Sequence, residues 1–154
     1  MVHSATRDTN PPGGTKRQRR FTTLWKVWHM AGKRILVIED NRPNMELVTA
    51  LLEAAECEVL QAWTAEDGIR IAGTLQPALI LMDISLPGMD GLTATAALKQ
   101  DPYTKHIPVV ALTAHAMKGD EEKALAAGCS GYIAKPIDTR AFPKKITEFL
   151  NGPA

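Results

Sequence analysis

Residues 79–91 read LILMDISLPGMDG, and the order of strand, loop and helix can be predicted from this stretch. With Ala78 in front of it, the apolar part is a short continuous run, which is typical of a parallel strand buried on both faces. Asp83 follows the run directly, and Pro87-Gly88 marks a turn soon after it. We therefore predict a buried strand over 78–82, a loop, and a helix over 91–99.

The same alternation extends in both directions from this stretch. Strand-like segments lie at residues 35–38, 58–62, 108–112 and 131–134. Helical spacing or capping signals predict further helices over residues 43–55, 65–76 and 118–127, and a last one from a cap at Asp138 or Thr139 to about Leu150. Five strands alternating with five helices favour an α/β fold with a doubly wound parallel sheet.

In such sheets, ligands bind at the carboxyl ends of the strands. Glu39 and Asp40 follow the first predicted strand, Asp83 the third, Thr113 the fourth and Lys135 the fifth. Taken singly, these residues are an ordinary helix cap, turn residue, structural hydroxyl and solvated lysine. Because all of them lie at one edge of one sheet, together they predict a functional site.

Three carboxylates that are close together repel one another, and a hard divalent cation relieves the repulsion. We expect Mg²⁺ here, with Asp40 and Asp83 as direct ligands and Glu39 acting through a water. One oxygen of Asp83 then stays free to attack phosphorus. Lys135 and the Thr113 hydroxyl suit the remaining phosphoryl oxygens, because phosphoryl transfer depends mostly on positioning and charge stabilisation.

These residues lie in segments that resemble the receiver domain of two-component response regulators. The segments are ILVIEDN at 35–41, LILMDISLPGMDG at 79–91, VVALTA at 109–114 and GYIAKPI at 131–137. The resemblance extends from about Lys33 to Leu150. It implies a flavodoxin-like (βα)5 fold with strand order 2-1-3-4-5.

The resemblance also implies residue roles. Asp83 matches the phosphoacceptor, and Glu39 and Asp40 match the acidic metal pair. Ser85 stands where the family offers a backbone carbonyl to the metal, so the implied Mg²⁺ site comprises Glu39, Asp40, Asp83 and Ser85. Thr113 matches one of the two phosphoryl-binding side chains.

Lys135 matches the other phosphoryl-binding side chain, and the Lys135–Pro136 bond matches one that is usually cis in the family. Tyr132 matches an aromatic switch residue whose ring turns inward when Thr113 moves; alternatively, it is a plain half-buried strand aromatic. His115, two residues past Thr113, either tunes dephosphorylation or is a surface histidine without a role.

Residues 111–138 resemble stand-alone receivers of the cell-division and polarity type, and also receiver domains of hybrid kinases. We expect a single-domain response regulator that is phosphorylated by a sensor histidine kinase or a histidine phosphotransfer protein. It would signal to a downstream protein through a switched face near Met117, Lys118 and Tyr132. It would be no enzyme beyond its own phosphorylation and dephosphorylation, and a monomer or a weak phosphorylation-dependent dimer.

Charge is distributed unevenly along the 154-residue chain, whose net charge is +1. Residues 1–30 sum to +5 and the rest to −4, so we predict a basic, disordered tail or an early start over 1–30 and a receiver domain over 31–154. No apolar run has the length of a membrane span, and Cys57 and Cys129 read as reduced thiols of a cytoplasmic protein. No DNA-binding domain is expected.

Other function classes stay open at this stage. A hydrolase of the haloacid-dehalogenase type would place a second Asp where Ser85 stands. A phosphorylation-independent adaptor would not need the acids and Lys135. A phosphorelay intermediate would use the same residues as a regulator, and a nucleic-acid or membrane role of the tail could be tested by trimming residues 1–29.

Overall fold

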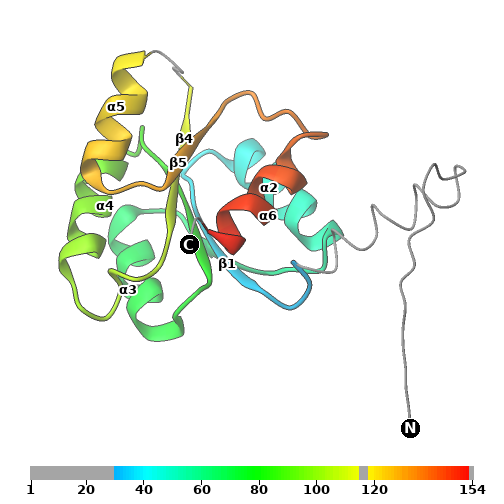
Figure 1. The fold of residues 1–154 in the computed structure, drawn as a ribbon, viewed down its shortest axis with the longest axis horizontal. Coiled ribbons are helices and arrows are strands. Elements are labelled where there is room, and N and C mark those ends of the chain that lie inside the picture. Colours follow the sequence, from blue (N-terminus) through cyan, green and yellow to red (C-terminus); the bar gives the residue numbers. More distant parts are fainter. Residues whose placement is uncertain (1–29, 115–117, 153–154) are drawn as a thin grey trace, which may run out of the picture.

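Strands and helices alternate along the whole part of the chain that the computed structural model describes, residues 30–114 and 118–152 (Figure 1). The strands are β1 (Arg34–Ile38), β2 (Glu58–Ala62), β3 (Leu79–Asp83), β4 (Val109–Thr113) and β5 (Gly131–Ala134). The helices are α2 (Arg42–Ala54), α3 (Ala65–Leu75), α4 (Gly91–Gln100), α5 (Lys118–Ala127) and α6 (Phe142–Asn151).

The five strands form one parallel sheet in the order β2-β1-β3-β4-β5, which confirms the predicted fold. Helices α2 and α6 cover one face, and α3, α4 and α5 cover the other (Figure 1). Every residue of β3 and β4 is buried, as expected for central strands with helices on both sides. Because all five strands are parallel, their carboxyl ends lie at the same edge of the sheet.

The two central strands reach one residue further than predicted. β3 includes Asp83 because its ladder with β4 continues to the pair Asp83 and Leu112, and β4 includes Thr113 because its ladder with β5 continues to the pair Thr113 and Ala134. The amide of Ile84 still donates to the Leu112 carbonyl at 3.2 Å. Both polar side chains thus stand on the sheet itself and not on a loop, so their positions are fixed by strand pairing.

The predicted start of the last helix was wrong. α6 begins at Phe142, and Asp138 instead closes the preceding turn by accepting hydrogen bonds from the amides of Arg140 (3.0 Å) and Ala141 (3.2 Å). Pro143 explains the late start, because a residue without an amide proton fits best in the first helical turn, where that proton would have no intrahelical acceptor.

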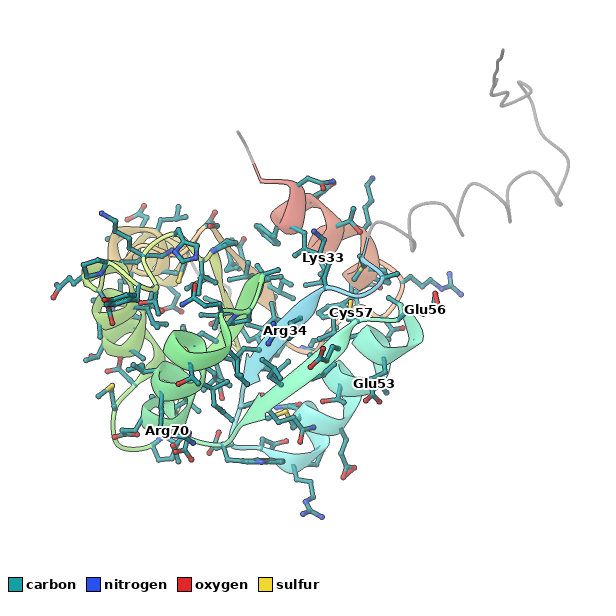
Figure 2. The ribbon with its side chains drawn as sticks, turned by 90° about the horizontal axis from the view of Figure 1, so that it is seen from below. Lys33, Arg34, Glu53, Glu56, Cys57 and Arg70 are labelled. Carbon is teal, nitrogen blue, oxygen red and sulfur yellow. The ribbon has the colours of Figure 1, made fainter. Side chains whose placement is uncertain are left out.

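Figure 2 shows Lys33 and Arg34 near the start of β1 and Cys57 just before β2, at the opposite edge of the sheet, where the strands begin. Near the start of β1, Gly32 donates to the Glu56 carbonyl at 2.9 Å and the Cys57 thiol donates to the Met30 carbonyl at 3.4 Å. Met30 is only 1% exposed, so the core includes one residue of the predicted tail.

Cys57 and Cys129 are free and buried, as expected for reduced thiols. Burial raises the pKa of the Cys57 thiol to about 11, which keeps it protonated and unreactive near neutral pH. Of the helices in the described residues, none has both the length and the apolar character needed to cross a membrane.

Gly91 lies where the neighbouring backbone leaves no room for a side chain. A Cβ built there would overlap the Asp83 carbonyl oxygen and lie 2.7 Å from Ile84 Cα, and both atoms belong to backbone that cannot yield easily. We expect Gly91→Ala to lower the free energy of unfolding by about 1–3 kcal/mol, measured by urea denaturation. Gly73→Ala, in the exposed part of α3 with no atom near its Cβ, should instead raise it by about 0.5–1 kcal/mol. Equal effects of the two substitutions would contradict this account.

Candidate functional site

Three carboxylates meet at the carboxyl edge of the sheet. Glu39 and Asp40 follow β1, and Asp83 ends the neighbouring strand β3. One oxygen of each carboxylate lies within 4.8 Å of the other two. Glu39 is fully buried and Asp83 is 3% exposed, whereas Asp40 is open to solvent. The predicted convergence of these acids is therefore confirmed.

Lys135 brings a cation to two of these acids. Its Nζ lies 2.9 Å from Glu39 Oε1 and 3.3 Å from Asp83 Oδ1, and its side chain is 15% exposed. The lysine follows β5 directly, and its amide donates to the Thr113 carbonyl at 2.7 Å. The Lys135–Pro136 peptide bond is cis, as the resemblance implies.

The environment drives the pKa values of the two buried acids apart. Burial raises the pKa of Glu39 to about 7; the adjacent Asp83 carboxylate adds to this rise, and Lys135 opposes it. Burial acts in the same direction on Asp83, but Glu39, the Ser85 amide and Lys135 together outweigh it and lower its pKa. Near neutral pH, Asp83 is thus ionised while Glu39 is partly protonated.

The acids have the chemistry of a site for a hard divalent cation. Among the described residues, Glu39 Oε2 is a buried side-chain oxygen without a hydrogen-bond partner. Lys135 supplies a single positive charge to two buried acids, which leaves negative charge at the edge. Oxygen donors and an excess of negative charge are what Mg²⁺ selects. The residues present therefore fit the predicted metal.

The amide of Ser85 donates to Asp83 Oδ1 at 2.9 Å. This hydrogen bond orients the carboxylate and places the Ser85 backbone next to the site. That the Ser85 carbonyl binds the metal stays a prediction.

Two further predicted residues lie on β4, which is next to β3, and on β5, which is next to β4. Thr113 ends β4 and is 3% exposed, one position beyond the residue that pairs with Asp83. Tyr132 on β5 pairs with Ala111 and is half-buried against the core cluster between the sheet and α3, α4 and α5. This position fits a half-buried strand aromatic, and its movement as a switch stays a prediction. His115 and Met117 lie outside the described residues.

Two residues at this edge were not predicted from the sequence. Gly91 lets the first turn of α4 lie against the Asp83 backbone, and its signal was a glycine, a poor helix former, at a helix start. Trp63 directly follows β2 and is 39% exposed, and its signal was a large aromatic residue at the end of a strand.

The chain resembles several proteins of one family. It is 43% identical over 118 residues to the polar-differentiation response regulator DivK of Brucella ovis, which covers 77% of this chain and 96% of the relative. The solved receiver domain of the sensor histidine kinase PA1611 from Pseudomonas aeruginosa PAO1, which has a magnesium ion coordinated in its active-site cleft, is 33% identical. It matches with a TM-score of 0.72 over 80% of this chain and all of that chain.

A third similarity is to the receiver domain of the response regulator Ssk1 of Saccharomyces cerevisiae, solved together with the histidine phosphotransfer protein Ypd1. It is 27% identical, with a TM-score of 0.71 over 77% of this chain and 88% of that chain. The model of the response regulator receiver domain matches residues 35–147. With its five-stranded sheet and its acids at the carboxyl edge, this chain belongs to the response regulator receiver family.

Proposed function

We propose that Asp83 accepts a phosphoryl group in a Mg²⁺-dependent reaction, and that this modification switches the protein between two signalling states. The observation that carries the proposal is the cluster at the carboxyl edge, where an ionised Asp83 lies 3.3 Å from Lys135 and beside two further acids. The residues of this edge suit phosphoryl transfer better than hydrolysis by a second Asp, because Ser85 stands where that Asp would be needed.

In the proposed reaction, one carboxylate oxygen of Asp83 forms a bond to phosphorus. The bond from phosphorus to the donor nitrogen or oxygen breaks, and its electron pair stays with the leaving group. Lys135 and Thr113 bind phosphoryl oxygens, which carry the negative charge of the transferred group. Mg²⁺, held by Asp40, Asp83 and the Ser85 carbonyl with Glu39 through a water, would neutralise charge at the phosphoryl group.

The relatives support the finer parts of this proposal. A magnesium ion in the cleft of the PA1611 receiver supports the cofactor, and the Ypd1–Ssk1 complex supports a phosphotransfer protein or histidine kinase as donor. Output would pass to a downstream protein through the face of α5 and β5, in the manner of a regulator or relay. The protein would act in the cytoplasm as a monomer or weak dimer, and catalyse only its own phosphorylation and dephosphorylation.

Asp83→Asn tests the phosphoacceptor. Incubation with Mg²⁺ and acetyl phosphate should add a single phosphoryl group to the unsubstituted chain, detected by intact mass, and none to the variant. The amide is nearly isosteric but lacks the nucleophilic oxyanion. Omission of Mg²⁺ serves as the second control. Failure of the folded, metal-loaded chain to gain mass would favour the phosphorylation-independent adaptor.

The raised pKa of Glu39 predicts a pH dependence of Mg²⁺ binding. Metal binding favours the deprotonated carboxylate, so a proton is released when the pH lies below about 7. We expect the affinity to rise about tenfold from pH 6 to pH 8 and then to level off, measured by calorimetry in buffers of different ionisation enthalpy. Glu39→Gln should bind more weakly and lose the dependence. Equal affinities of the unsubstituted chain at pH 6 and pH 8 would refute the assignment.

Lys135→Ala separates metal binding from phosphoryl transfer. Because Lys135 forms ion pairs with the carboxylates of Glu39 and Asp83, its removal should raise the affinity of these carboxylates for Mg²⁺. The loss of its positive charge should slow phosphorylation by acetyl phosphate at least about tenfold. Both quantities can be measured on one preparation, by calorimetry and by intact mass over time. A parallel fall of both would indicate that Lys135 mainly supports the fold.

A further inference from the structure

Large apolar side chains are exposed at five positions of the described residues, and three of these positions can be assigned to one or the other edge of the sheet. The five are Leu47, Trp63, Leu75, Tyr103 and Leu125. Leu75 ends α3, and the Gln76 side chain beside it donates to the Tyr103 carbonyl at 2.9 Å, so Leu75 and Tyr103 lie at the edge where the strands begin. Trp63 directly follows β2 and therefore lies at the opposite edge, together with the acids.

Trp63 is held between two fixed points. The carbonyl of Ala62 before it accepts a hydrogen bond from the Glu39 amide at 3.0 Å, which ties this segment to the acidic pair. Thr64 after it caps α3 by accepting from the Asp67 amide at 3.1 Å. About three fifths of Trp63 is covered already, and the rest faces solvent.

We propose that Trp63 is the anchor on which a protein phosphodonor, a protein bearing a phosphohistidine, docks to reach Asp83. The inference rests on the proposed function. Asp83 is almost buried at the carboxyl edge, so a donor side chain reaches it only if the donor covers that edge. Only β1 lies between β2 and β3, which puts the end of β2 about 10 Å from that of β3. A protein interface of about 800 Å² per partner has a radius of about 16 Å and would include Trp63.

The physical character of Trp63 fits an anchor. Tryptophan is enriched among the few residues that carry most of the binding energy of an interface. A large ring on a short, pinned connection loses little conformational entropy on binding. Leu47, which is 38% exposed, lies within α2, whereas Trp63 stands at the strand end itself.

A small phosphodonor needs no docking surface, and this difference provides the test. Acetyl phosphate should phosphorylate Trp63→Ala at a rate within about twofold of the unsubstituted chain, because the hydrogen bonds and ion pairs of the acids and Lys135 in the described residues do not involve the Trp63 side chain. Transfer from a protein donor should fall about 10- to 100-fold in kcat/KM, as for removal of an interface anchor.

The protein probe is the fastest donor found among the histidine kinases and phosphotransfer domains of the source genome. The kinases are autophosphorylated with labelled ATP, the phosphotransfer domains are labelled by transfer from these kinases, and each donor is mixed briefly with the full chain. Transfer to Trp63→Ala, Trp63→Phe and two matched controls is then followed over time. The controls are Leu75→Ala, with nearly the same exposed fraction (38%), and the exposed aromatic Tyr103→Ala, both at the opposite edge. Trp63→Phe should recover part of the loss.

A loss confined to Trp63→Ala and to the protein donor is the expected result. Equal transfer to Trp63→Ala and the unsubstituted chain would overturn the anchor, as would a parallel loss with acetyl phosphate or an equal loss in Leu75→Ala. The absence of any protein donor for a chain that acetyl phosphate does phosphorylate would overturn the anchor and leave the proposed function standing. No reaction of the unsubstituted chain with acetyl phosphate would overturn both.

Discussion

The repulsion between buried carboxylates is the constraint on which the carboxyl edge depends. Glu39 and Asp83 are both nearly inaccessible to water, and bringing two charges out of water costs far more than a surface ion pair returns. Two features of the site reduce this free-energy cost. Lys135 shares its positive charge between them, and Glu39 keeps its proton up to about pH 7. What remains is a site that is stable without metal and still has negative charge to bind one.

Such a site needs a rigid frame, and the parallel sheet provides it. Asp83 and Thr113 are the last residues of fully buried strands, so hydrogen-bonded ladders fix where their side chains begin. The first turn of α4 lies directly against the backbone of Asp83, which only glycine at position 91 permits. The amide of Ser85 then fixes the rotation of the carboxylate. The precision of the site thus comes from backbone packing, with few side chains involved.

Much of this arrangement could be predicted from sequence because it follows from periodicity and topology. The apolar run before Asp83 identifies a buried strand, and parallel strands bring Glu39, Asp83 and Lys135 to one edge. Chain order cannot reveal how charge is shared there, since the pKa of Glu39 depends on distances and burial. The local sequence pattern also does not give the start of α6. Asp138 has a capping signal, but the helix begins at Phe142, where Pro143 falls in its first turn. Trp63 was missed for a similar reason, because its exposure is a property of the assembled edge.

The position of Lys135 also affects how the site can change between its metal-free, metal-bound and phosphorylated states. In the structure its Nζ contacts the same carboxylates that the proposed metal would use, so lysine and metal would compete for Glu39 and Asp83. Binding of a divalent cation would have to displace one ion pair before it gains another, which limits the net free energy of metal binding. Phosphorylation of Asp83 would then offer the released ammonium a more highly charged partner than the one it lost. The lysine thus has a partner in every state of the site, and an exchange of partners can proceed without leaving a buried charge uncompensated.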